Sequence, residues 1–278
     1  MGELVAEILN GGAFTGLYLL IFLLAKWLKN ACCSYNIDAE LVATDNLAVA
    51  VAMSGYYLAT AVIFVGALLG PSSGLLHDLL IVGGYAVLGL LLLNASRLFN
   101  ERLILRKFCN TKQLISQRNV AVGAVHCGIY IATGVIAAGA VSGQGGNALT
   151  AIIFFVLGQL SLAGFSKIYE KLSPYDVHQE LQNGNIAAGV AFAGNLIALA
   201  IIIMHSSAGD FTNWQQDLTE FAVSNLFAFA FLVGLRWFFN HNVVPNISLA
   251  KEISADKNIG AGFLEAVLVI SASMVIAA

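Results

Sequence analysis

The sequence predicts an all-α polytopic membrane protein with eight transmembrane helices, and three observations predict it. Of the 278 residues, 59% are hydrophobic and 10% are charged, whereas a soluble domain carries about 25% charged residues. The apolar residues gather in eight runs of about 20 residues, the length that crosses a hydrocarbon core of about 30 Å. The sequence around every second run also repeats, which predicts four parallel two-helix repeats.

The runs are long and continuously apolar, which favours helices over the alternating strands of a membrane barrel. The first run does not resemble a cleavable signal peptide, because the acidic stretch "MGELVAEILNGG" precedes it and the cations Lys26 and Lys29 follow it. This charge order predicts a helix whose N-terminus lies outside. We expect the eight helices at approximately 8–28, 47–69, 79–98, 120–141, 148–168, 186–204, 217–238 and 259–278.

The positive charges predict the topology. All 13 lysines and arginines lie between an odd-numbered helix and the next even-numbered helix, or at the helix ends that border this connection. The opposite loops, "GPSSGLLHD", "SGQGGN" and "HSSAGDFTNWQQD", contain none. Because cytoplasmic loops carry the excess of positive charge, we expect a multi-pass protein of the bacterial inner membrane. Both termini would be periplasmic, the four basic connections cytoplasmic, and the lipid bilayer its surroundings.

An asparagine opens each even-numbered helix, and a Glu or Gln precedes it by five or six residues. Asparagine is among the best N-capping residues, so capping is its simplest role. The four helix N-termini would also meet at the cytoplasmic mouth, where their dipoles favour an anionic group. The asparagines are Asn46, Asn119, Asn185 and Asn258, and the preceding residues are Glu40, Gln113, Glu180 and Glu252.

The odd- and even-numbered helices differ in the size of their side chains. The even ones are rich in Gly, Ala and Ser, as in "AVAVAMSG" and "AAGVAFAG", whereas the odd ones are rich in Leu and Phe, as in "LYLLIFLLAKWL". Small residues permit close helix packing in lipid. We therefore expect the even helices to be inner and the odd helices outer, in a pseudo-fourfold ring or bundle of four hairpins.

Three segments resemble a known family. They are "YDVHQELQNGNIAAGVAFAGNLIALAIII" from Tyr175, "YNIDAELVATDNLAVAVAMSGYYLATAVI" from Tyr35, and "GFLEAVLVI" near the C-terminus. These segments look like the bacterial inner-membrane family catalogued as domain of unknown function 350, the YjfL-like proteins. Since one such domain spans four helices, the resemblance implies two in tandem, which we place at 1–143 and 144–278. It implies no established activity, and the family is associated with envelope-stress and polyamine-related genes.

One predicted face of the inner helices carries polar side chains. Ionisable groups in hydrocarbon are costly and usually face protein or water. His126 and Glu265 each lie seven residues after the opening Asn of their repeat, so in a fourfold ring they would face each other as an intramembrane ionisable pair. The alternative is a neutral Glu265 that is hydrogen-bonded to a nearby helix. The same face holds Tyr57, Thr60, Tyr130 and Thr133.

Other chemistries find little support in the sequence. The four cysteines suggest no disulfide framework, and without a Cys- or His-rich cluster we expect no metal site and no cofactor. The net charge of −3 gives no reason to expect nucleic acid as a partner. An enzyme is the least favoured class, because we find no nucleophile motif and no phosphate-cradling loop.

Two function classes therefore remain. The first is a channel or transporter for protons, cations or a small polar solute, which would use the polar inner face. The second is a non-transporting scaffold or envelope-stress component that recruits a cytoplasmic protein partner through the basic connections, above all "RLFNERLILRKFCNTKQLISQR" from Arg97. That segment fits an amphipathic stretch at the lipid headgroups equally well. A homo-oligomer is compatible with either class.

Overall fold

The computed structural model describes residues 2–70, 72–142, 145–208, 210–242 and 248–278, and every regular element in these ranges is helical. Eight of the helices are long and apolar enough to cross a membrane. The predicted all-α polytopic fold class is therefore confirmed. The eight are α1 (Gly2–Cys32), α3 (Leu47–Leu68), α4 (Leu75–Leu103), α5 (Val120–Val141), α6 (Ala148–Leu172), α8 (Ile186–Ser207), α9 (Trp214–Asn242) and α11 (Ile259–Ile276).

A short helical element precedes the second membrane helix of each repeat, that is α3, α5, α8 and α11. These elements are only five or six residues long, and each contains the Glu or Gln of the repeated motif. They lie at the end of the molecule where the basic residues gather. They are α2 (Ile37–Val42), the π-helical turn η1 (Lys112–Ser116), α7 (Val177–Gln182) and α10 (Leu249–Ser254).

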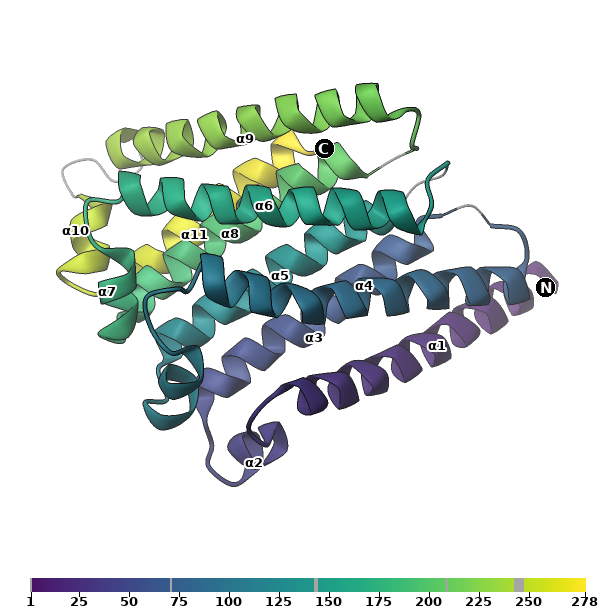
Figure 1. The fold of residues 1–278 in the computed structure, drawn as a ribbon, viewed down its shortest axis with the longest axis horizontal. Helices are drawn as coiled ribbons and strands as arrows, with labels where there is room; N and C mark the ends of the chain where they lie inside the picture. Colours follow the sequence, from purple (N-terminus) through teal and green to yellow (C-terminus); the bar gives the residue numbers. More distant parts are fainter. Residues whose placement is uncertain (1, 71, 143–144, 209, 243–247) are drawn as a thin grey trace.

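The membrane helices form two layers. Helices α1, α4, α6 and α9 make one layer, and α3, α5, α8 and α11 cross behind them (Figure 1). In the second layer each helix packs most extensively against the next one along the chain, α3 on α5, α5 on α8 and α8 on α11. The four inner helices therefore form a row, with α3 and α11 at its two ends, rather than the pseudo-fourfold ring that we expected.

Glycines explain why the row forms. A Cβ atom at Gly123 of α5 would lie 2.5 Å from the carbonyl oxygen of Ala48 in α3, and one at Gly189 of α8 would lie 2.5 Å from that of Ala121 in α5. Such close backbone contact is available only to glycine. The equivalent position in α3, four residues after Asn46, is the half-buried Ala50, so α3 has no glycine on the face where a preceding helix would pack.

Burial follows the expected division between inner and outer helices within each pair. In every pair the second helix is the more buried. Within an apolar stretch of 18 residues, 83% of residues are buried in α5 against 33% in α4, and 33% in α11 against 22% in α9. However, α11 is less buried than the outer helix α6, which is 50% buried. The position at the end of the row explains this, since only α8 packs extensively on α11 within the layer.

Candidate functional site

Each inner helix begins with the same polar module. The side-chain oxygen of Asn46, Asn119, Asn185 or Asn258 accepts hydrogen bonds from backbone N–H groups in the first turn of its helix. The residue before each Asn has a positive φ, between 47° and 73°. The amide of each Asn donates to the preceding Glu or Gln side chain at 2.7 to 2.9 Å. The module thus turns the chain from the short helix into the membrane helix.

The same amides also join one repeat to the next. Asn46 Nδ2 donates to Leu114 O at 3.0 Å, Asn119 Nδ2 to Leu181 O at 2.7 Å, and Asn185 Nδ2 to Ile253 O at 2.8 Å. Each acceptor lies directly after the Glu or Gln of the following repeat. These bonds fix the register of the row. An anion site at the four helix ends stays a prediction.

Glu265 lies in a cluster of side chains from four helices. It is 2% exposed in α11, and its Oε1 accepts hydrogen bonds from Asn195 Nδ2 of α8 at 3.0 Å and Tyr169 OH of α6 at 3.4 Å. Arg236 Nε of α9 lies 3.8 Å from the same oxygen. The Arg236 guanidinium also lies over the Tyr169 ring, 4.6 Å from its centroid, and donates to Ser173 Oγ at 3.0 Å. The carboxylate is thus paired with a cation inside the protein.

His126 occupies a different cluster. It is 4% exposed in α5, its Nε2 has no hydrogen-bond partner, and its ring lies 6.0 Å from that of Tyr130. Lys29, which is 2% exposed, donates to Tyr130 OH at 2.5 Å. The predicted facing of His126 and Glu265 depended on a ring, and in the observed row α8 packs between α5 and α11. The structure therefore does not bring the two side chains together.

The two clusters nevertheless occupy equivalent places in the two halves of the chain. Arg97 and Arg236 each lie 22 residues before an opening Asn, and His126 and Glu265 each lie seven residues after the same Asn. In the second half the arginine faces the carboxylate. In the first half Arg97 pairs with Glu101 at 2.8 Å instead, and donates to Cys32 O at 3.0 Å. The sequence carries a signal for Arg236, because a cation followed by two apolar or aromatic residues recurs near the end of each odd-numbered helix, at Lys26, Arg97, Lys167 and Arg236.

A cavity of about 390 Å³ lies beside the Glu265 cluster. Its polar floor includes three partners of Glu265, namely Tyr169, Asn195 and Arg236. Aromatic side chains bridge α6 and α9 here, with the Phe165 and Phe229 rings 5.7 Å apart, and these two helices are not among the extensively packed pairs. The other lining residues are Ile168, Leu172, Pro174, Leu232, Val233, Trp237, Ser248 and Ala250, together with Phe165.

The remaining residues of the predicted polar face have local partners. Thr60 Oγ1 donates to Tyr56 O in its own helix at 3.0 Å, and the half-buried Tyr57 ring packs 4.8 Å from that of Phe22. Thr133 Oγ1 accepts from Asn100 Nδ2 at 3.3 Å, and the same amide donates to Gln159 at 3.1 Å. Thr60, Thr133, Tyr57 and Tyr130 therefore contribute to helix packing in the structure.

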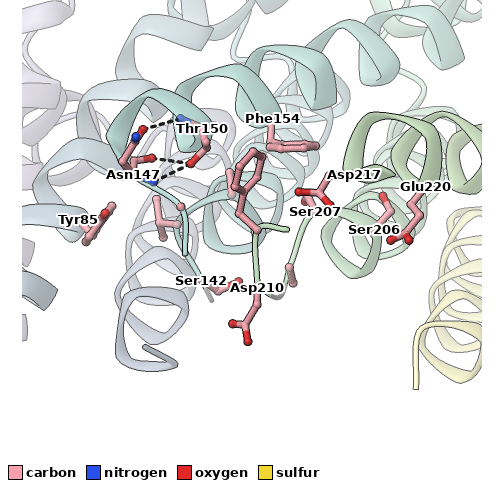
Figure 2. A pocket seen from close by; sticks show the side chains of 15 residues that line it. Tyr85, Ser142, Asn147, Thr150, Phe154, Ser206, Ser207, Asp210, Asp217 and Glu220 are labelled. Carbon is pink, nitrogen blue, oxygen red and sulfur yellow. Dashed lines mark hydrogen bonds between the residues drawn. The ribbon is translucent and has the colours of Figure 1, made fainter. Parts of the chain in front are cut away.

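A small pocket of about 100 Å³ lies at the opposite end of the helices from the Asn modules (Figure 2). Asn147 and Thr150 form a capping box on one side of it. The carboxylate of Asp217 accepts hydrogen bonds from the backbone N–H and hydroxyl of Thr212 at 3.1 and 2.7 Å. Glu220 accepts from Gln216 at 2.9 Å. The Asp217 carboxylate thus orders the start of α9.

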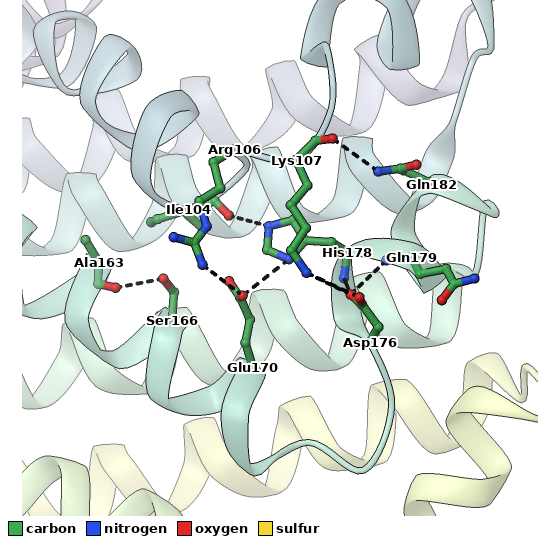
Figure 3. Close-up of polar contacts among 10 residues, drawn as sticks. All are labelled: Ile104, Arg106, Lys107, Ala163, Ser166, Glu170, Asp176, His178, Gln179 and Gln182. Atoms are coloured by element: carbon green, nitrogen blue, oxygen red, sulfur yellow. Dashed lines mark hydrogen bonds and ion pairs between the residues drawn. The ribbon is translucent and has the colours of Figure 1, made fainter.

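A polar cluster joins the two halves of the chain at the end that carries the Asn modules (Figure 3). The His178 ring is buried in α7, and its Nε2 lies 2.9 Å from Ile104 O, to which only an N–H can donate. Nδ1 faces Glu170 Oε2 at 3.5 Å, and Arg106 lies 3.6 Å from the same oxygen. Lys107 also pairs with Asp176 at 3.2 Å.

Burial lowers the pKa of His178 below its ordinary value, and Glu170 opposes this effect only in part. The neutral form is therefore favoured in the folded chain, with the proton on Nε2. Sequence reasoning missed this cluster, because His178 and Glu170 lie in polar stretches that look like solvated loops. The basic segment from Arg97 is visible in the sequence, but its contacts with Glu170 of α6 and His178 of α7 depend on the packing of the two halves.

Comparisons with known proteins agree with the repeated architecture. The UPF0719 transmembrane protein YshE of Bacillus subtilis (strain 168) is 25% identical over 125 residues, which cover 45% of this chain and 88% of that protein. No solved structure matches the chain. The family model described as Domain of Unknown Function (DUF350) matches residues 3–141 and again 145–278. Our predicted division between residues 143 and 144 lies outside the described residues. This multi-pass membrane protein belongs to the DUF350 family and contains two tandem copies of its domain.

Proposed function

We propose that this protein is a transporter of the bacterial inner membrane for protons, cations or a small polar solute, with Glu265 and Arg236 at its binding site. One observation carries the proposal, a buried carboxylate that faces a guanidinium, where the guanidinium lines a cavity between membrane helices. Ionisable groups are costly within a membrane and commonly mark the path of an ion or substrate.

The geometry of the pair suits a site that changes partners. Charge-assisted hydrogen bonds between a guanidinium and a carboxylate are typically about 2.7–2.9 Å long, whereas Arg236 Nε and Glu265 Oε1 are 3.8 Å apart. A cation could therefore bind the carboxylate, or an anionic group the guanidinium, without first breaking a tight salt bridge. In this proposal the Glu265–Arg236 site replaces the central pair of His126 and Glu265 that we expected in a fourfold ring.

The membrane orientation that we propose follows the positive charges. The basic connections lie in the cytoplasm and both termini in the periplasm, so that Arg236, near the end of α9 that precedes α10, is close to the cytoplasmic side. The site would then open towards the inner leaflet or the cytoplasm, and the acid-lined pocket at Asp217 would lie near the periplasm.

A flux assay tests the proposal. The full chain is reconstituted in liposomes, and uptake of several monovalent cations, protons and polyamines is measured for the wild type, for Glu265→Gln and for the control Glu220→Gln. We expect Glu265→Gln to insert normally but to lose at least about tenfold in flux. Glu220 lies in the half of α9 away from the site, so its variant should retain flux. Wild-type flux in Glu265→Gln, or no flux in the wild type, would overturn the proposal.

The second candidate is a scaffold that recruits a cytoplasmic protein. The observation that favours it is the set of exposed cations at the end of α4 and on the connection to α5, of which Arg102, Lys112 and Arg118 are not in the ion pairs described above. A scaffold would lose its partner when these three are changed to Gln, whereas the flux of a transporter would be unaffected. Crosslinking in cells followed by mass spectrometry separates the two functions.

A further inference from the structure

We infer that the cavity between α6 and α9 binds the headgroup of an anionic membrane phospholipid, which enters sideways from the bilayer. The inference goes beyond the proposed transport, since a lipid can occupy the cavity whether or not a solute crosses the membrane. It shares Arg236 with the proposed transport site. The argument depends on where the cavity opens, on the chemistry of its floor and on its size.

The cavity opens towards lipid. Its rim consists of apolar residues on two membrane helices, and Leu172, Val233 and Trp237 are 54%, 39% and 64% exposed. In a membrane-spanning bundle, side chains at this depth face lipid rather than water. Tryptophan is also enriched at the level of the headgroups. A phospholipid can therefore place its headgroup in the cavity while its acyl chains stay in the bilayer.

The floor of the cavity presents a cation. Arg236 provides a guanidinium, which matches the geometry of a phosphate. Tyr169 and Asn195 are 3% and 1% exposed and donate to Glu265, so they hold the carboxylate in place. The exposed Ser248 adds a hydroxyl to the lining. Glu265 is not among the residues that line the cavity and lies behind these donors. A ligand in the cavity therefore contacts the Arg236 cation and not the Glu265 carboxylate, which favours an anionic ligand.

The volume limits how much of a lipid can enter. About 390 Å³ is near the lower end of the range of roughly 300–1,000 Å³ for ligand pockets in proteins. This volume suits a phosphate headgroup and the adjoining glycerol, but not the acyl chains. The equivalent outer helices of the first half, α1 and α4, pack extensively on each other, whereas α6 and α9 do not.

Native mass spectrometry of the delipidated full chain tests the inference. Phosphatidylglycerol, phosphatidylcholine and inorganic phosphate are titrated separately and in competition. We expect the wild type to prefer phosphatidylglycerol, and Arg236→Gln to bind it about tenfold more weakly. Arg97→Gln is the matched control, because Arg97 occupies the equivalent place in the first half and should leave binding unchanged.

Two further variants keep the result clear. Val233→Trp adds bulk to the cavity wall while Arg236 and Glu265 are both retained, and it should also abolish binding, even if Arg236→Gln folds poorly. Glu265→Gln removes a nearby negative charge and should bind the lipid at least as well as the wild type, although we expect it to lose flux. Equal binding of both lipids, unchanged binding in Val233→Trp, weaker binding in Glu265→Gln, or complete displacement by inorganic phosphate would overturn the lipid assignment.

Discussion

The two DUF350 copies share a framework and differ at one site. In the first copy Lys29, Arg97 and His126 lie in or beside a closely packed region, and Arg97 has its carboxylate partner on its own helix. In the second copy Arg236 faces Glu265 across helices, next to a cavity. The equivalent positions thus hold a histidine near cations in one copy and a carboxylate with its counterion in the other.

The difference separates the residues that assemble the protein from those that we propose to give it a function. The opening Asn residues and the Glu or Gln partners make the same bonds in both copies, and glycines bring the inner helices together throughout the row. These features determine the architecture. Two features change between the copies and leave that architecture intact. Glu265 replaces His126, and the outer helices α6 and α9 are less closely packed than α1 and α4.

The largest effect should come from the helix contacts of the row. Gly189→Val would place a branched side chain against the backbone of Ala121, which cannot move without separating α5 and α8. We expect a loss of more than about 3 kcal/mol, or no folded protein at all. Ala50→Val changes the equivalent residue of the first copy, where α3 is the first helix of the inner row, and should cost less than about 0.5 kcal/mol. Thermal unfolding in detergent measures both.

Equal damage from both variants would contradict this comparison. It would mean that another protein surface covers the Ala50 face of α3, and the end of the row would have to be reinterpreted as an interface.

A smaller effect should come from the opening asparagines. Asn119 and Asn258 are equivalent residues of the two copies, but Asn119 is 6% exposed and also bonds Leu181 O, whereas Asn258 is exposed at the end of the row. We expect Asn119→Ala to lose about 2–4 kcal/mol, the sum of a helix cap and a buried carbonyl left without its donor. Asn258→Ala should lose only the cap, about 1 kcal/mol.

Unfolding temperatures of the two variants, measured under identical conditions, check this prediction. Similar losses would show that the bond between repeats contributes little, and that capping alone accounts for the role of these residues.

Much of the fold could be predicted from the sequence, because the length of an apolar run largely decides whether a helix crosses a membrane. The ends of the helices were less predictable. The helix expected at 79–98 spans Leu75–Leu103, since its flanking polar residues continue the helix beyond the apolar run. In contrast, the helix expected from residue 120 does begin there, because Asn119 caps it.

The arrangement of the helices was harder to predict, although a signal was present. Glycine occurs four residues after the opening Asn in repeats two, three and four but not at Ala50, and nine residues after it in repeats one, two and three but not at Val267. The first and the last inner helix each lack one of the two glycines, which indicates a row with two free ends. In a closed ring, every inner helix would need both glycines to pack on two neighbours. The contact between Glu265 and Arg236 depends on this packing. Sequence spacing alone therefore predicted His126, instead of Arg236, as the partner of Glu265.

The smallest predicted effect concerns pH and the contact between the two copies. The first short helix of each copy has a titratable residue two positions after its N-cap, the exposed Asp38 in α2 and the buried His178 in α7. Because burial lowers the pKa of His178 in the folded chain, the unfolded chain binds the proton more readily. Stability should therefore fall as the pH drops below about 6.5, by at most about 1.4 kcal/mol per pH unit from this residue. The variant His178→Gln should show a shallower fall in stability between about pH 6.5 and about pH 5, measured as the unfolding temperature at each pH.

Asp38→Asn is the matched control. Asp38 pairs with Lys26 at 3.0 Å, with side chains 53% and 44% exposed, so its loss should cost less than about 1 kcal/mol and leave the slope in this range unchanged. An identical slope in the wild type and in His178→Gln would mean that His178 does not titrate with folding, and that the contact between the copies is insensitive to pH.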